Sequence, residues 1–531
     1  EGPLLVLAGA GSGKTRVLTF RIARMIGDLG IRPWQILAIT FTNKAAAEMR
    51  ERLAAMLPDG GMRGMWVCTF HAMCVRILRE DADLLGYTGQ FTIYDDDDSR
   101  RMVREIMTQL GIEQKQYPIN MIRSKISTAK NAMIGPEEFI EKASSPQEQK
   151  AGQVYLELER RLRAANAMDF DDLLVRTLEL LRTRPEVLEK YQERFRYISV
   201  DEYQDTNHVQ YEIANLLAAK YQNLMVVGDD DQSIYAFRGA KVGNMSDFVK
   251  EYKVEKIIKL EQNYRSTSHI LDGANAVIAN NKDRMGKNLW TDAGAGEPIR
   301  LYRAEADMQE ARAVVQDIMV EKRRGKKYSD FAILYRNNNL SRNFERMLSA
   351  NSIPYRVYGG LRFFDRQEVK DVVAYLRVLA NADDTSLLRI INQPPRGIGA
   401  TTVERATTMA SDAGVTIWEI LAEADSVPEI RRAHAFVTLL EEISAEAEGK
   451  SLPELITLVS QKSGLEAFYQ KQQDADVRLE NLGELVNAAV GYCEENGIDE
   501  DAPALEPVPG GTMSPLDGFL SQAALEPDDK N

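Results

Sequence analysis

Short apolar runs alternate with amphipathic stretches over the first part of the chain. Leu4–Leu7, Ile36–Ile39 and Met65–Cys68 are continuous apolar runs, which is the pattern of strands buried on both faces. Each run leads into small or polar residues and then into a helical stretch, such as Ala45–Leu53. Strands that alternate with helices predict a parallel sheet whose strand carboxyl ends meet at one edge. We expect a ligand site at that edge.

From about residue 80 to 195 amphipathic helical patterns dominate, for example over Asp98–Gly111 and Tyr155–Ala165. Met168–Leu174 is typical of a helix start, with Asp169 as the N-cap. The acidic run Asp95–Asp98 is interpreted as an exposed helix start rather than a metal site. The region is predicted to be a helical domain inserted into the sheet domain.

Strand patterns return at Arg196–Val200, Asn223–Val227 and Lys256–Leu260. Beyond them, a second sheet domain, half built, is predicted from three further strands and a helix, namely Ile299–Tyr302, Phe331–Tyr335, Tyr355–Tyr358 and the helical Gln309–Arg324. From Phe364 the pattern is helical again. The tail Glu495–Asp529 is acidic and rich in Pro and Gly, which predicts a flexible linker.

Composition narrows the class of protein without naming a function. A chain of 531 residues is too long for one core, so several domains are expected. No apolar run is long enough to span a bilayer, and three cysteines form no disulfide or zinc pattern, so we expect a reducing cytoplasm and no membrane partner. The net charge of −14 argues against a basic nucleic-acid coat protein, although a local groove can still bind nucleic acid.

The first predicted strand runs into a loop of small residues that opens a helix. The loop comprises Ala8, Gly9, Ala10, Gly11, Ser12, Gly13, Lys14 and Thr15. Such a loop lets backbone N–H groups surround phosphates, and the helix N-terminus adds its positive end. Lys14 would reach the β- and γ-phosphates and Thr15 would bind Mg²⁺. Ala8 stands where the strict pattern has Gly, and the rest matches a nucleotide-binding P-loop.

Two later loops carry the polar groups that a nucleotide hydrolase needs opposite its P-loop. Asp201 and Glu202 directly follow a predicted strand, where Asp201 would hold Mg²⁺ and Glu202 would polarise the attacking water. Gln232 lies after the next strand and is placed to hydrogen-bond the γ-phosphate or its water. Arg265, after the strand that follows, is a candidate arginine finger.

Aromatic and cationic residues share these loops. Tyr235, Phe237 and Arg238 would provide ring planes and a charge for stacked bases. Thr69 and Phe70 pair a hydroxyl with a ring, which suits a nucleic-acid contact. In isolation the pair slightly favours the alternative, in which the threonine caps a helix and the phenylalanine lies in the core.

Gly397 and Gly399 frame a turn before a helix N-terminus in the last helical part of the chain. Free N–H groups there can hold a DNA phosphate without reading sequence. A plain structural turn is an equal alternative.

These stretches, in this order, resemble the motifs of superfamily 1 DNA helicases of the UvrD/PcrA/Rep type, nearest to the PcrA-like branch. The matching segments are Ala8–Arg16, Thr40–Ala46, Thr69–Leu78, Met168–Leu174, Asp201–Asn207, Gly228–Ala240, Leu260–Thr267, Tyr355–Asp371 and Pro394–Gly399. They cover essentially the whole chain, and Asp201–Asn207 is the most specific of them.

The resemblance implies an α/β fold of the P-loop NTPase class with two RecA-like parallel-sheet domains, the second incomplete, each with a helical insertion. The expected first RecA-like domain spans 1–80 and 190–264, with its insertion at 81–189. The first half of the second RecA-like domain is expected at 265–363, and its insertion, with the acidic tail, at 364–531.

The resemblance also implies an ATP-driven motor that moves 3′→5′ on single-stranded DNA in DNA repair or replication, with ATP and Mg²⁺ as cofactors. Single-stranded DNA, single/double-strand junctions and repair or replication proteins are the implied partners. The implied ATPase residues are Lys14, Thr15, Asp201, Glu202, Gln232 and Arg265, with adenine between Tyr264 and Arg16. The implied DNA contacts are Thr69, Phe70, Tyr235, Phe237, Arg238, Asn338, Gly397 and Gly399.

Some features depart from the family. Phe237 stands where the family usually has Trp, which predicts a weaker grip on DNA. A glutamine-bearing adenine motif is expected before residue 1 and motifs V and VI after residue 531, so the chain is expected to be an incomplete motor. A nucleotide-gated DNA-binding module without productive turnover is therefore the alternative. A small-molecule kinase is disfavoured, because it does not need aromatic residues on several sheet-edge loops.

Overall fold

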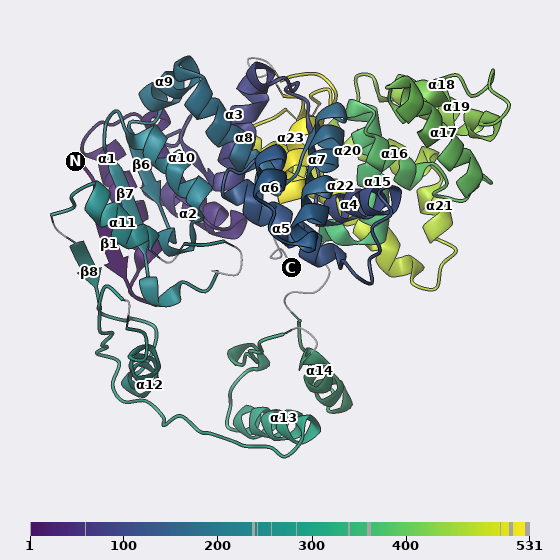
Figure 1. Cartoon of the computed structure of the whole chain (residues 1–531). Coiled ribbons are helices and arrows are strands. Elements are labelled where there is room, and N and C mark those ends of the chain that lie inside the picture. Colours follow the sequence, from purple (N-terminus) through teal and green to yellow (C-terminus); the bar gives the residue numbers. More distant parts are fainter. Residues whose placement is uncertain are drawn as a thin grey trace.

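The computed structural model describes residues 2–58, 60–235, 239–241, 243–255, 257–282, 284–337, 340–357, 363–499, 501–508 and 513–525. Figure 1 shows a sheet domain on the left and a broad helical region across the top and right. A smaller group hangs below them and contains α12 (Ser268–Ile278), α13 (Asp307–Arg323) and α14 (Ser341–Ala350).

The sheet domain is built on six strands in the order β3-β2-β6-β7-β1-β8, and every pair is parallel. Their bounds are β1 (Leu4–Ala8), β2 (Ile36–Thr40), β3 (Trp66–Thr69), β6 (Tyr197–Val200), β7 (Leu224–Gly228) and β8 (Ile257–Leu260). The apolar runs of the sequence form these strands, since a sheet covered on both faces buries side chains on both sides. The predicted parallel sheet is confirmed, and the carboxyl ends of β1, β6 and β7 lie side by side.

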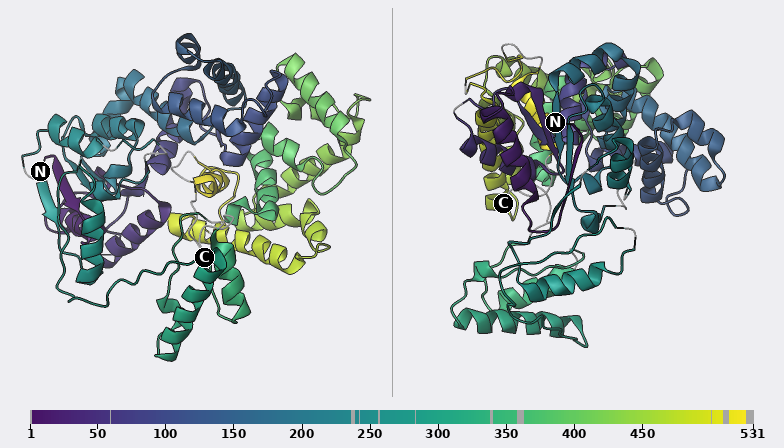
Figure 2. Two further views of the ribbon diagram at one scale, coloured as in Figure 1. Left: turned by 60° about the horizontal axis from the view of Figure 1, so that its bottom comes forward. Right: turned by 90° about the vertical axis from the view of Figure 1, so that its left-hand side faces the viewer.

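Helices cover both faces of this sheet (Figure 2). They are α1 (Lys14–Gly27) and α2 (Asn43–Met56) on one face, and α3 (Phe70–Asp81), α10 (His208–Ala218) and α11 (Asn244–Glu251) on the other. Strand β1 shows the alternation that separates the two cores. Leu5 and Leu7 pack with the second group, whereas Val6 and Ala8 pack with the first.

Between α3 and β6 the chain is helical, as predicted, apart from a short two-stranded sheet of β4 (Thr92–Ile93) and β5 (Ala167–Met168). The helices are α4 (Asp96–Gln109), α5 (Ile119–Asn131), α6 (Pro136–Lys142), α7 (Pro146–Ala164), α8 (Phe170–Thr183) and α9 (Pro185–Arg194). α4, α5 and α7 enclose a core of their own, whereas α8 and α9 pack into the core of the sheet domain. Asp169 caps α8 as predicted, and its side chain accepts from the backbone N–H of Asp172.

The acidic run at the start of α4 forms the expected helix start, with Asp95 as the N-cap and Asp98 closing a capping box. The prediction that the run is exposed is wrong for these two residues. Lys370 Nζ lies 3.1 Å from Asp95 and 2.6 Å from Asp97, and Arg377 lies 2.7 Å from Asp98. The run therefore joins the insertion to the second helical region through ion pairs.

The second helical region begins after residue 363, as predicted, and has its own core. Its helices are α15 (Gln367–Asn381), α16 (Asp384–Ile390), α17 (Ala400–Ala413), α18 (Ile417–Ala422), α19 (His434–Ala447), α20 (Leu452–Lys462), α21 (Leu465–Tyr469), α22 (Ala475–Asn496) and α23 (Pro515–Leu525). The predicted linker over Glu495–Asp529 is wrong where it contains α23. Leu516 and Phe519 on this helix are buried in the core. The prediction was wrong because the Pro and Gly content of the tail as a whole outweighed its short apolar segment.

The strands predicted for a second sheet domain are not formed in the described part of residues 265–357. Ile299–Tyr302, Phe331–Tyr335 and the described part of Tyr355–Tyr358 carry no strand, and Leu301 and Leu334 are 96% and 94% exposed. A strand needs hydrogen-bonding neighbours, and none pairs with these stretches among the described residues. The predicted helix between them is confirmed as α13.

Among the described residues, no helix combines the length and the apolar character needed to cross a bilayer.

Candidate nucleotide and nucleic-acid site

The P-loop connects β1 to α1 at the carboxyl edge of the sheet. Gly11 and Gly13 have φ angles of 68° and 92°, the left-handed region that favours glycine. The Ser12 hydroxyl donates to the Gly9 carbonyl at 2.7 Å and closes the turn. α1 begins at Lys14, so the side chains of Lys14 and Thr15 leave from its first turn. This glycine turn followed by a helix start is the local geometry that the P-loop motif predicts.

Two polar pairs join the P-loop to the end of β6. Lys14 Nζ lies 2.9 Å from Glu202 Oε2, and the Thr15 hydroxyl donates to Asp201 Oδ2 at 3.3 Å. The structure therefore brings together four of the predicted site residues, two from the first turn of α1 and two from the loop after β6.

The oxygen atoms of Thr15 and Asp201 fit a magnesium ion chemically, since Mg²⁺ prefers hydroxyl and carboxylate oxygens. Burial first, and the neighbouring Glu202 carboxylate second, raise the pKa of Asp201 to about 6. A divalent cation beside Asp201 would stabilise its charged form and reverse this shift. Asp201 thus offers a carboxylate oxygen, the donor type of a metal ligand, and its charged form would be stabilised by a bound cation.

Glu202 has a φ of 49°, a conformation that non-glycine residues rarely adopt. Its side chain accepts from Gln204 Nε2 at 2.8 Å, and Gln204 Oε1 accepts from the Asp229 backbone N–H at 3.0 Å. The loops after β6 and β7 are therefore linked through one glutamine.

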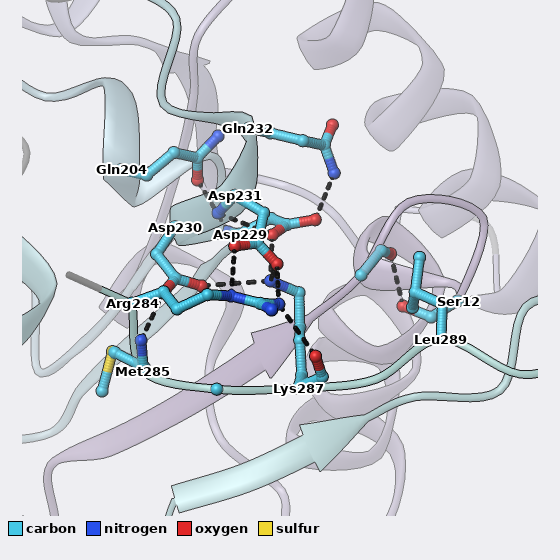
Figure 3. Close-up of polar contacts among 12 residues, drawn as sticks. Ser12, Gln204, Asp229, Asp230, Asp231, Gln232, Arg284, Met285, Lys287 and Leu289 are labelled. Atoms are coloured by element: carbon cyan, nitrogen blue, oxygen red, sulfur yellow. Dashed lines mark hydrogen bonds and ion pairs between the residues drawn. The ribbon is translucent and has the colours of Figure 1, made fainter. Parts of the chain in front are cut away.

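Gln232 lies in a short 3₁₀ helix, Asp230–Gln232, just after β7. Its backbone N–H donates to the Asp229 carbonyl at 2.9 Å, and its side-chain amide donates to the Asp229 carboxylate. Asp229 thus determines where the Gln232 amide lies (Figure 3).

The segment after β8 lies directly on the P-loop. Asn263 Nδ2 donates to the Ala10 carbonyl at 2.6 Å, and the Tyr264 N–H donates to the Gly11 carbonyl at 3.0 Å. A Cβ atom on Gly11 would lie 2.9 Å from Arg265 Cβ. Arg265 is therefore adjacent to the phosphate loop, as an arginine finger requires.

The two residues predicted to enclose adenine have exposed side chains next to this loop. Tyr264 is 73% exposed, and its hydroxyl donates to Gln262 Oε1 at 2.9 Å. Arg16 is exposed on α1, with its guanidinium 5.4 Å from the Phe20 ring. Both side chains are thus open to solvent beside the P-loop.

A segment that the sequence analysis did not single out, Arg284–Trp290, crosses the same edge, and we call it the strap. A Cβ atom on Gly9 would overlap Leu289, and Lys287 lies against the Asp229–Asp231 loop (Figure 3). No local motif marks the strap, because its partners lie in other loops.

One aromatic pair forms a candidate surface for bases. The rings of Phe41 and Tyr235 lie 4.9 Å apart at an interplanar angle of 34°, and both residues are half-buried. Tyr235 is on the same loop as Gln232, so the two predicted ligand surfaces share that loop. Phe41 itself was not named as a predicted contact, although its loop lies in the matching segment Thr40–Ala46 and pairs hydroxyl groups with a ring as the Thr69-Phe70 loop does.

The prediction for Phe70 is corrected by the structure. Its ring is 4% exposed and packs in the core, which leaves no free face for a base. The Thr69 side chain accepts from the Ala72 N–H at 3.3 Å as the N-cap of α3. The helix-cap alternative therefore holds at this turn.

The remaining predicted contacts divide into two groups. Phe237, Arg238 and Asn338 lie outside the described residues. Gly397 has a φ of 73° and Gly399 is the N-cap of α17, far from the sheet in Figure 1. The turn that holds the two glycines is not brought together with the nucleotide site.

Comparison with known proteins gives an independent result. The family model described as UvrD/REP helicase N-terminal domain matches residues 1–253. The model described as UvrD-like helicase C-terminal domain matches residues 258–531. Together the two matches cover both the sheet domain and the second helical region.

Curated relatives agree with these matches. The ATP-dependent DNA helicase PcrA of Leuconostoc citreum is 42% identical over 533 residues, which is 98% of this chain and 71% of the relative. PcrA of Staphylococcus epidermidis strain RP62A is 44% identical, and PcrA of Staphylococcus aureus strain Mu50 is 43% identical, each across 94% of this chain and 70% of the relative. The chain belongs to the UvrD/REP helicase family.

Proposed function

We propose that this chain is an ATP-dependent DNA helicase that translocates 3′→5′ along single-stranded DNA and acts in DNA repair or replication. The observation that carries the proposal is the loop after β7. Gln232 lies on that loop, which Gln204 links to Glu202, and Tyr235, three positions later, pairs with Phe41 at the candidate base surface. A change in the bound phosphates would therefore alter the loop that carries Tyr235, and with it the candidate DNA-binding surface.

The nucleotide part of the function follows from charge and geometry. Lys14 and the P-loop N–H groups would bind the phosphates, and the neighbouring carboxylate of Glu202 would take a proton from the attacking water. Gln232 would orient that water or the γ-phosphate. Arg265, beside Gly11, would stabilise the charge that develops in the transition state.

Thr15 and Asp201 would hold Mg²⁺, and Tyr264 and Arg16 would enclose the adenine ring. Mg²⁺ bound there supplies positive charge that offsets the negative charge of the phosphates. The raised pKa of Asp201 is consistent with this role, because a cation bound beside the carboxylate would stabilise its charged form.

DNA binding would rest on stacking and on phosphate contacts, which read little sequence. Phe41 and Tyr235 form the described part of the stacking surface, and Phe237 and Arg238 follow Tyr235 on the same loop. Gly397 and Gly399 precede a helix N-terminus that would contact the phosphates of a duplex at a single/double-strand junction.

We assign the residue ranges to the domains of the proposed motor. Residues 1–80 and 190–264 form the ATPase domain, to which α8 and α9 also pack. Residues 265–363 form part of the second motor domain, and 364–531 form the second helical region.

The experiment is ATP hydrolysis by this chain with and without single-stranded DNA, for the wild type, K14A and a control, K150A, at a partly exposed lysine of α7. Stimulation by single-stranded DNA that K14A abolishes and K150A retains supports the proposal. A wild type that binds both ligands without turnover would instead indicate a nucleotide-gated DNA-binding module. Displacement of a labelled strand from duplexes with a 3′ or a 5′ tail tests the direction, and unwinding from 5′ tails alone would contradict it.

A further inference from the structure

Lys287, at the centre of the strap, inserts its ammonium group among three consecutive carboxylates. It contacts Asp229, and it lies 3.0 Å from Asp230 Oδ1 and 2.6 Å from Asp231 Oδ2 (Figure 3). The Lys287 side chain is 1% exposed, so these contacts are screened little by solvent. The three carboxylates offer oxygen atoms within 4.8 Å of one another, and the lysine is the cation that they share.

Two neighbours of Lys287 complete the attachment. Arg284 forms a bidentate pair with Asp231, with distances of 2.9 and 2.6 Å, and the Met285 N–H donates to Asp230 Oδ2 at 2.6 Å. Each of the three loop carboxylates therefore has at least one partner in the strap. Bidentate and charge-assisted bonds of this kind hold geometry strongly.

The other end of the strap lies on the P-loop and on the end of β8. Leu289 packs so closely on Gly9 that a Cβ atom there would overlap it. The Trp290 N–H donates to the Glu261 carbonyl at 3.1 Å, and the Asn263 N–H donates to the Trp290 carbonyl at 2.8 Å. The strap thus touches the P-loop, the loop after β7 and the segment that carries Arg265.

Asp229 connects the strap to Gln232. One of its carboxylate oxygens accepts from the Gln232 amide, and the other contacts Lys287. Burial works against the charge on Lys287, but its bonds to Asp229 and Asp231 outweigh burial and raise the pKa of the lysine. Lys287 therefore stays charged and fixes the Asp229 carboxylate, which in turn orients the Gln232 amide.

We infer that Lys287 is a positioning residue for ATP hydrolysis, which neutralises the Asp229–Asp231 loop and holds Gln232 in register with the P-loop through the strap. The inference rests on the proposed function, and it adds a residue without a predicted contact to nucleotide or DNA. Because the strap also packs on Gly9, the loop after β7 and the P-loop would move together.

The test compares K287Q with the wild type, with K287R, which keeps the charge, and with K282Q, which alters an exposed lysine five positions earlier. Steady-state ATP hydrolysis with saturating single-stranded DNA gives kcat and KM separately. The expected result for K287Q is a loss of about tenfold or more in kcat with KM for ATP changed by less than about threefold. K287R should recover part of kcat, and K282Q should match the wild type.

Hydrogen exchange supplies a readout that does not depend on turnover. The Gln232 N–H bonded to Asp229 and the Met285 N–H bonded to Asp230 should exchange faster in K287Q, while amides of β6 keep their protection. An unchanged kcat together with unchanged exchange at these two amides would overturn the inference. An equal rise in exchange throughout the sheet would also overturn it, because it would indicate a general structural role.

If K287Q does not fold, R284Q decides, because it removes the pair with Asp231 and leaves the buried lysine in place. A folded R284Q with wild-type kcat and exchange at Gln232 would reject the inference, and a lower kcat at constant KM would support it. A wild type without DNA-stimulated turnover would count against the proposed function, whereas active wild type and K287Q chains with equal kcat would count against the strap alone.

Discussion

The ammonium group of Lys14 lies 2.9 Å from the carboxylate of Glu202, across the gap between the P-loop and the end of β6. In the proposed mechanism Lys14 binds the nucleotide phosphates and Glu202 activates water, so the two groups would have competing partners. A nucleotide phosphate would compete with Glu202 for the same lysine, so nucleotide binding and activation of the base would be coupled.

The first prediction concerns E202Q, which removes the charge that competes for Lys14. We expect kcat for ATP to fall by about 10² to 10⁴, the range for loss of a general base, while nucleotide affinity stays equal or improves. Single-turnover hydrolysis and equilibrium binding of a fluorescent ATP analogue measure the two effects separately. Weaker binding in E202Q would contradict the competition.

The second prediction concerns the ring pair of Tyr235 and Phe41. Y235A should weaken binding of oligo-dT by about 1–3 kcal/mol, the range measured for one base stacked on an aromatic ring. Fluorescence anisotropy of a labelled oligonucleotide measures this loss. Y302A, at an exposed tyrosine far along the chain, is the control and should bind like the wild type.

The third prediction concerns Lys130, a buried lysine whose ammonium lies within 3.1 Å of Glu159, Asp169 and Asp172. K130M would leave Asp169 and Asp172 in a buried site without the lysine, while Glu159 would keep its pair with Arg176. We expect a loss of about 3–5 kcal/mol in the free energy of unfolding, as when one partner of a buried pair is removed.

Urea unfolding of K130M and of K125M tests this expectation. Lys125 forms a pair at 3.4 Å with Glu148, both partly exposed, so K125M should cost at most about 1 kcal/mol. Equal losses in the two variants would show that the buried cluster stabilises the fold no more than the partly exposed pair does.

The fourth prediction concerns His71, whose ring lies at the start of α3 against Phe170, with centroids 5.9 Å apart. Burial lowers the pKa of His71 to about 4 from a usual value of 6.5, although a hydrogen bond to the Phe170 backbone opposes the shift. The unfolded chain therefore takes up this proton at a higher pH than the folded chain does. The contribution of neutral His71 to the free energy of unfolding is therefore complete above about pH 6.5 and is lost as pH falls toward 4.

The free energy of unfolding, compared between the wild type and H71Q from pH 7 to pH 4.5, isolates this effect. The wild type should lose stability relative to H71Q as pH falls. Parallel curves for the two proteins would show that the histidine is not buried in its neutral form.

Features set by local sequence were predictable. The P-loop, the apolar strands and the N-cap at Asp169 each depend on residues within a few positions of one another, and all are present in the structure. The parallel direction of the strands also followed from the alternation of strands and helices, although no order of the strands was predicted.

Features that depend on distant partners were not predictable. The strand potential of Ile299–Tyr302 has no effect without a neighbouring strand, and Leu301 stays exposed. Lys287 has no local signature, because Asp231 is 56 residues away in the chain. The burial of Phe70 and the ion pairs of Asp98 depend in the same way on tertiary packing.

The central claim is that one loop, the loop after β7, serves both the nucleotide and the DNA strand. The most direct measurement is the affinity of this chain for labelled oligo-dT with and without a saturating non-hydrolysable ATP analogue, in the wild type and in Y235A. We predict that the analogue changes the affinity for oligo-dT by about fivefold or more in the wild type and much less in Y235A. A wild type that binds both ligands, and binds the oligonucleotide equally well with and without the analogue, would contradict it.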